Sequence, residues 1–212
     1  MPVSEQVQVQ QPVIRKMQEP APGASAATLR DILLGMAPRP DFGVTLALAG
    51  VVARSWTENG PQFLPLFGLD ADTTRDVLEN HFPGCSSVLT HSWESLSEAP
   101  AFAEAIELED LVTLLVDYRI VPDDDSRWLA HAIATACLGS DHLWQDMNLR
   151  SRGVLSELLH GFFTALAVRN RQDMKWKKFL YLQLCERAEI RVCKSPSCGA
   201  CTDYTVCFGS EI

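Results

Sequence analysis

The sequence predicts an all-α protein, and three of its features carry that prediction. Apolar residues recur every three or four positions along several segments, as they do on the buried face of a helix. Proline and glycine separate these segments. No stretch shows the sustained alternation of apolar and polar residues that indicates a β-strand. We therefore expect one helical domain of about six or seven helices. It would lie between a disordered N-terminal tail and a C-terminal cysteine-rich metal-binding loop.

Composition limits the classes of partner. The length of 212 residues is enough for one domain with a sizeable core, and 47% hydrophobic with 21% charged residues is typical of a soluble globular protein. A net charge of −9 argues against nucleic acid, because phosphate binding needs a basic surface. The most apolar run, residues 42–53, is shorter than the roughly 20 residues that span a bilayer. We expect neither nucleic acid nor a membrane as partner.

The elements follow in order. Residues 1–25 are rich in Gln and Pro with little periodicity, so we predict a disordered tail there. The helical domain is expected to cover residues 26–192. Its first helix begins at Ala26 and ends before Pro38. The segment from Phe42 to Trp56, rich in Ala, Leu and Val, predicts a buried helix.

An acidic residue marks the start of the next helix. Asp70 or Asp72 is expected to cap a helix that runs through His81. Residues 84–97 are irregular and predict a long loop. After Pro100 comes a helix with a clear apolar stripe that ends near residue 118.

Three further helices complete the domain. One follows the acidic triplet Asp123–Asp125 and ends near Gly139. The next presents one apolar face from residue 155 to residue 166, and the last runs from Met174 to about Ala188.

The cysteine-rich segment, residues 193–212, carries the chemistry. Four of the seven cysteines are spaced C-x4-C-x2-C-x5-C. They are Cys193, Cys198, Cys201 and Cys207. Thiolate is a soft ligand that suits zinc, copper(I) and iron–sulfur clusters. The odd cysteine count and the absence of an export signal point to a reducing cytoplasm, where such spacing more often indicates a metal site than disulfides.

Spacing alone leaves the metal open. Unequal short spacings within one loop are common among iron–sulfur sites, whereas structural zinc more often uses two C-x2-C pairs. Both remain candidates, with disulfides or free thiols the minor alternative. His142, beside two aspartates, and Cys185, on the preceding helix, are further candidate ligands, although packing is the commoner role for both. Cys85 and Cys137 are expected in the core.

Basic residues cluster just before the motif. Residues 169–194 contain eight Lys or Arg and three acidic residues, a local charge of +5 in a chain of −9. This run is either a solvated helix face, or a surface that stabilises a negative cluster, attracts an oxyanion such as molybdate or docks an acidic partner. No Ser-His-Asp pattern, phosphate-binding glycine loop or HExxH is present, and we expect no enzyme activity.

Several of these segments together resemble the NifQ family of nitrogen-fixation proteins. They are residues 174–187 (MKWKKFLYLQLCER), the four-cysteine motif with Phe208-Gly209, residues 142–146 (HLWQD) and residues 81–84 (HFPG). The resemblance is densest over about residues 140–209 and extends back to about residue 40. Met147-Asn148 stands where the family leads us to expect Leu-Gly, so no special turn is predicted there.

The resemblance implies a cytoplasmic metallochaperone that donates molybdenum for synthesis of the iron–molybdenum cofactor of nitrogenase. It implies a molybdenum–iron–sulfur cluster on Cys193, Cys198, Cys201 and Cys207, molybdate or another molybdenum source, and delivery to the cofactor scaffold complex and the nitrogenase iron protein. The alternative is a helical protein-interaction module with a structural four-cysteine zinc site.

Overall fold

The computed structural model describes residues 25–58, 66, 68–89, 105–189, 204–209 and 211, with the side chains of residues 58 and 105–108 left aside. Within these ranges there are ten α-helical segments, one 3-10 turn and no strand, which confirms the all-α prediction. Seven of these helices have 11 to 16 residues and three are single turns of four. The predicted tail, except Ser25, and Cys193, Cys198 and Cys201 lie outside the described residues.

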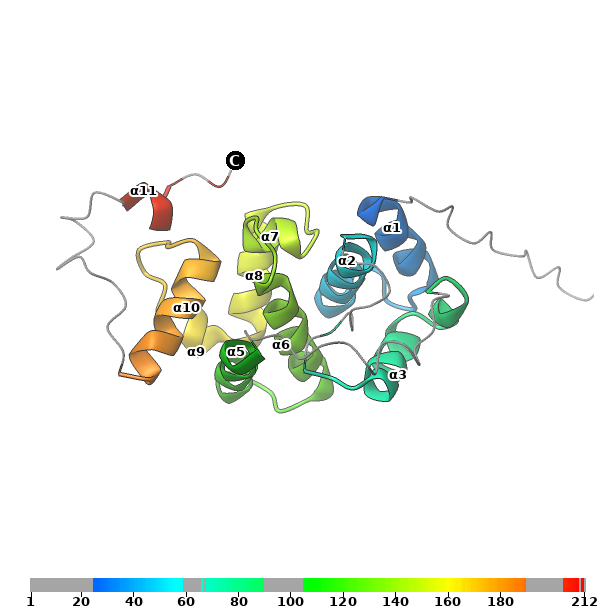
Figure 1. Cartoon of the computed structure of the whole chain (residues 1–212), viewed down its shortest axis with the longest axis horizontal. Coiled ribbons are helices and arrows are strands. Elements are labelled where there is room, and N and C mark those ends of the chain that lie inside the picture. The colour runs from blue at the N-terminus through cyan, green and yellow to red at the C-terminus, as the bar shows by residue number, and fades with distance from the viewer. Residues whose placement is uncertain are drawn as a thin grey trace, which may run out of the picture.

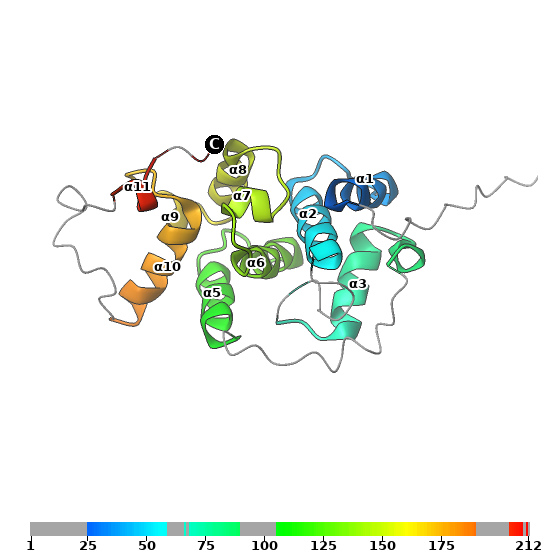
Figure 2. The same cartoon turned by 45° about the horizontal axis from the view of Figure 1, so that its top comes forward.

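The helices follow one another around a shared core. In chain order they are α1 (Ala26–Met36), α2 (Gly43–Glu58), α3 (Ala71–His81), the 3-10 turn η1 (Cys85–Ser87), α5 (Ala105–Asp117), α6 (Asp124–Cys137), α7 (Leu143–Asp146), α8 (Arg152–Phe162), α9 (Thr164–Ala167), α10 (Trp176–Arg187) and α11 (Tyr204–Cys207). α1 to α3 lie at one end, α5 to α8 in the middle, and α9 to α11 at the other end (Figures 1 and 2). No helix of the described ranges has both the length and the apolar character needed to cross a membrane.

Side-chain caps fix where the longer helices begin. The Asp70 carboxylate accepts a hydrogen bond from the Thr73 N–H at 2.7 Å, and the Asp123 carboxylate accepts one from the Ser126 N–H at 2.8 Å. These bonds satisfy N–H groups that have no partner within the helix. They also hold the pKa of both carboxyls below its usual value. The predicted acidic starts of α3 and α6 are confirmed, with Asp70 rather than Asp72 as the cap.

α2 and α6 form the centre of the core. Leu48 and Val52 of α2 and Ile133 of α6 are fully buried. A Cβ at Gly50 would come within 2.0 Å of the Met147 carbonyl oxygen, so only glycine lets α2 approach the end of α7 this closely.

The two cysteines expected in the core are found there. Cys85 and Cys137 are buried, and burial raises the pKa of each thiol to about 12, with Glu79 adding to the effect at Cys85. Both thiols therefore stay protonated at neutral pH, which makes them poor metal ligands as they stand.

One predicted helix, residues 155–166, is in fact two. α8 ends at Phe162 and α9 starts at Thr164, because Phe163 leaves the helical conformation at φ −131° and ψ 46°. The Phe162 carbonyl instead accepts a hydrogen bond from the Ile120 N–H at 2.9 Å, and the Phe163 side chain is fully buried. The helix is therefore broken by a contact with a distant segment, although its apolar residues recur without interruption.

Candidate metal centre and the basic pocket beside it

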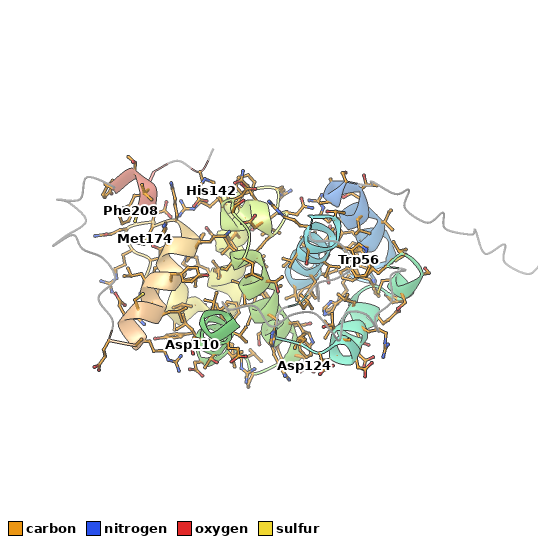
Figure 3. The ribbon with its side chains drawn as sticks, in the orientation of Figure 1. Trp56, Asp110, Asp124, His142, Met174 and Phe208 are labelled. Carbon is orange, nitrogen blue, oxygen red and sulfur yellow. The ribbon has the colours of Figure 1, made fainter. Side chains whose placement is uncertain are left out.

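The segment that carries Cys207 packs against the start of α10. The Lys175 N–H donates to the Cys207 carbonyl at 2.8 Å, and Lys175 Nζ donates to the Thr205 carbonyl at 3.0 Å. Phe208 is buried and its ring stacks on that of Tyr204, with centroids 4.5 Å apart. Figure 3 shows Phe208 and Met174 at the same end of the molecule, with Trp56 toward the opposite end. Cys207 itself is half-buried at this end of α10.

A buried carboxylate also anchors this segment. The Glu211 side chain is only 4% exposed, with one oxygen 3.5 Å from Arg152 Nε and the other 3.8 Å from His142 Nδ1. Arg152 further donates to the Met174 carbonyl at 3.0 Å and pairs with Asp173 at 2.8 Å. Residues on either side of Cys207 are therefore held against α7, α8 and α10.

Three helices share a cluster of buried ionic side chains. The Asp146 side chain is 1% exposed and pairs with Lys177 of α10 and, at 3.1 Å, with Arg54 of α2. Lys177 Nζ also donates to the Gly139 carbonyl at 2.8 Å. Because Arg54 bonds the Asp141 carboxylate at 2.7 Å, the pKa of Asp141 is held below its usual value. The cluster connects α2, α7 and the first turn of α10.

The turn after α7 departs from the sequence prediction. Asn148 adopts a left-handed conformation, with φ of 49°, although no special turn was expected there. Asparagine tolerates this region better than most residues. The Arg30 guanidinium donates to the Asn148 carbonyl at 2.8 Å and holds the turn against α1. The turn therefore forms with asparagine at the position where glycine was expected.

A pocket of about 610 Å³ opens between α10, the 139–145 segment and the Cys207 segment. Its ionisable lining residues are Asp141, His142, Lys175, Lys177, Lys178 and Glu211. Val206, the neighbour of Cys207, lines it as well. His142 precedes α7 as its N-cap residue, and its N–H donates to the Gln145 side chain at 3.2 Å.

The structure separates the two additional candidate ligands. His142 shares the pocket with Val206 and is connected through Glu211 to the Cys207 segment. Cys185 lies ten residues beyond Lys175 on α10, about 15 Å along the helix axis, and is not brought to Cys207. Among the described residues, no three His, Cys, Asp or Glu side chains are grouped to hold a metal.

The basic run divides into two environments. Lys175, Lys177 and Lys178 line the pocket. Arg169 and Arg187 instead pair with Glu186 at 3.6 Å and Asp117 at 2.7 Å on the α5–α10 side, which fits a solvated face.

Sequence reasoning assigned no role to Arg54, Arg152 or Glu211. A single arginine within the otherwise apolar run of α2 was the one signal available, since a charge on a buried face needs a partner. The partners of all three lie far away in the chain, and no local pattern identifies them.

Comparisons with known proteins agree on one family. The sequence model of the family described as NifQ matches residues 47–209. The chain is 42% identical over 162 residues to the "Protein NifQ" of Azotobacter vinelandii, covering 73% of this chain and 83% of that protein. It is 36% identical over 143 residues to the "Protein NifQ homolog" of Sinorhizobium fredii, covering 68% of this chain and 60% of that protein.

A further relative, the "Protein NifQ" of Rhodobacter capsulatus, is 36% identical over 124 residues, which are 52% of this chain and 69% of that protein. No solved structure matches the chain. The family match covers well over half of the sequence, including the buried ion cluster, Cys207 and every pocket-lining residue except Glu211. The chain belongs to the NifQ family.

Proposed function

We propose that this chain carries molybdenum for nitrogen fixation and donates it to synthesis of the nitrogenase iron–molybdenum cofactor. A molybdenum–iron–sulfur cluster on Cys193, Cys198, Cys201 and Cys207 would hold the cargo. The observation that carries the proposal is the C-x4-C-x2-C-x5-C set of thiols in a member of the NifQ family. Thiolates are the ligands that iron–sulfur clusters take, and when bound the cluster supplies the sulfur ligands that suit molybdenum.

The environments of the described thiols support this assignment. Cys85 and Cys137 are buried and held protonated, whereas Cys207 is half-buried on a short helix at the surface. An exchangeable site needs thiols that solvent and a partner can reach. The Lys175 contacts hold this segment through the main-chain carbonyls of Thr205 and Cys207 and do not use the Cys207 thiol.

Delivery would take place to the cofactor scaffold complex and the nitrogenase iron protein. Tyr204 and Val206, which flank Cys207 on α11, are 46% and 51% exposed. Exposed apolar side chains next to a metal site suit a surface that partners cover during transfer. Such a protein acts as a carrier rather than an enzyme, and its thiols suit a reducing, cytoplasmic compartment.

Elemental analysis of the protein purified without oxygen tests the proposal. We expect iron with acid-labile sulfide, and molybdenum at or below about one atom per chain after loading. Alanine at each of the four motif positions should deplete iron and sulfide. Cys185→Ala removes a half-buried thiol at the other end of α10 and should leave the cluster in place.

Two results would contradict the proposal. One zinc per chain without sulfide, even after reconstitution with iron and sulfide, would assign the motif to the zinc-containing interaction module. Depletion by Cys185→Ala to the level of the motif variants would refute the four-ligand assignment.

A further inference from the structure

The pocket beside Cys207 has a distinctive charge balance. It takes three lysines from the start of α10 and faces them with the 139–145 segment and the Cys207 segment. Two carboxylates, those of Asp141 and Glu211, also line it. Each is already paired with an arginine, Asp141 with Arg54 at 2.7 Å and Glu211 with Arg152 at 3.5 Å.

The three lysines are not equivalent. Lys177 neutralises the buried Asp146 and belongs to the ion cluster. Lys175 donates to the Thr205 carbonyl, a neutral acceptor, and no carboxylate of the described residues forms an ion pair with it. Lys178 is exposed, and among the described residues no carboxylate pairs with it. Within the described part of the chain, the charges of Lys175 and Lys178 are therefore left for a ligand.

Helix polarity adds to this potential. Lys175, Lys177 and Lys178 surround the N-terminal turn of the 12-residue α10, which has no side-chain cap. The first N–H groups of a helix lack intrahelical partners and carry a partial positive charge. A walled pocket with these charges concentrates anions more strongly than a flat basic surface.

We propose that this pocket binds a tetrahedral oxyanion dianion of the molybdate class through Lys175 and Lys178, immediately beside Cys207. Two uncompensated ammonium groups match the charge of a dianion, and each supplies several N–H donors for its oxygens. The volume of about 610 Å³ leaves room for the ion with its water. The site rests on the structure alone. Only the identity of the anion as molybdenum cargo depends on the proposed function.

Binding of molybdate alone to cluster-free protein tests the site. The full chain with Cys193, Cys198 and Cys201 changed to serine retains Cys207 and its packing but has too few thiols for a four-cysteine cluster. Equilibrium dialysis at low ionic strength, with molybdenum measured by mass spectrometry, gives the affinity. Sulfate is measured in parallel as a second tetrahedral dianion.

Matched variants locate the site. Lys178→Glu reverses the unpaired charge and should weaken molybdate binding roughly tenfold or more, because a hydrogen bond to a charged group is lost and repulsion is added. Lys178→Gln should have a smaller effect in the same direction. Arg75→Gln also removes one exposed positive charge, but from α3 at the opposite end of the molecule, and should bind as the parent does (Figure 1).

The outcomes separate this site from the cluster. Molybdate binding that is lost in Lys178→Glu and retained in Arg75→Gln would support the pocket. Absence of binding to the cluster-free chain, or equal loss in Arg75→Gln, would overturn it. Tighter binding of sulfate than of molybdate would overturn the link to molybdenum. None of these results depends on whether the four cysteines hold iron or zinc. The test of the pocket is therefore independent of the test of the proposed function.

Discussion

Replacing Lys177 with methionine tests the buried ion cluster that supports the site. Methionine keeps most of the side-chain length but removes the ammonium group that pairs with Asp146 and donates to the Gly139 carbonyl. Among the described residues, Asp146 would then keep Arg54 as its cationic partner, at 3.1 Å, with its own side chain 1% exposed.

The magnitude follows from burial. Removing one member of a buried ion pair costs about 3–5 kcal/mol when the remaining charge is left alone. Because Arg54 remains, we expect Lys177→Met to lower the free energy of unfolding by about 2–3 kcal/mol. In a chain of this size, that is a fall in Tm of about 4–12 °C. Thermal unfolding followed by far-UV circular dichroism measures it.

A double-mutant cycle isolates the pair. In Asp146→Asn/Lys177→Met no carboxylate is left at position 146, so the double variant should lose less than the sum of the single variants, with a coupling of about 1–2 kcal/mol. Lys178→Met, one residue further and exposed, should change stability by less than about 0.5 kcal/mol. Equal effects of Lys177→Met and Lys178→Met, or strictly additive single variants, would refute the reasoning.

Three further outcomes follow from the packing and the caps. Gly50→Ala should lower the free energy of unfolding by at least about 1–3 kcal/mol, because a Cβ there would lie 2.0 Å from the Met147 carbonyl oxygen. Gly35→Ala should be neutral or slightly stabilising, because nothing lies within 4 Å of the new Cβ. Urea unfolding of the two variants compares them. Asp123→Ala should cost about 1 kcal/mol through loss of the α6 cap. The pKa of Asp123 is lower in the folded than in the unfolded protein. The difference in unfolding free energy between the parent and Asp123→Ala should therefore be full above the ordinary carboxyl pKa of 3.8 and decrease as the pH falls below it. Unfolding of both proteins as a function of pH checks this. Cys85 and Cys137, whose pKa values are about 12, should resist iodoacetamide in the native protein and react after unfolding, as peptide mass spectrometry would show.

Local signals in the sequence predicted most of the helices. The caps at Asp70 and Asp123 and the end of α1 before Pro38 lie where the sequence places them, because each is decided within one helical turn. α6 ends at Cys137, two residues before the predicted Gly139. The break at Phe163 was not predicted, since its cause is a hydrogen bond between Phe162 and Ile120, distant in the chain.

The candidate site was likewise only partly predictable from the sequence. Cysteine spacing and the basic run were visible in the sequence, and three of the basic residues do line a pocket beside Cys207. Asp146 lies 31 residues before Lys177 in the chain and meets it only in the folded protein. The sequence therefore does not show which of the three lysines is neutralised. Likewise, Glu211 reaches Arg152 and His142 across the fold. Composition alone identifies such charges but not their partners.

Transfer of molybdenum tests the central claim most directly. The protein is loaded with molybdenum, freed of unbound molybdate and supplied as the sole molybdenum source to the purified cofactor scaffold complex and nitrogenase iron protein. We predict that molybdenum moves to the scaffold and that cofactor forms, and that the Cys207→Ala variant supports neither. Retention of molybdenum by the carrier, under conditions where free molybdate yields cofactor, would contradict the account.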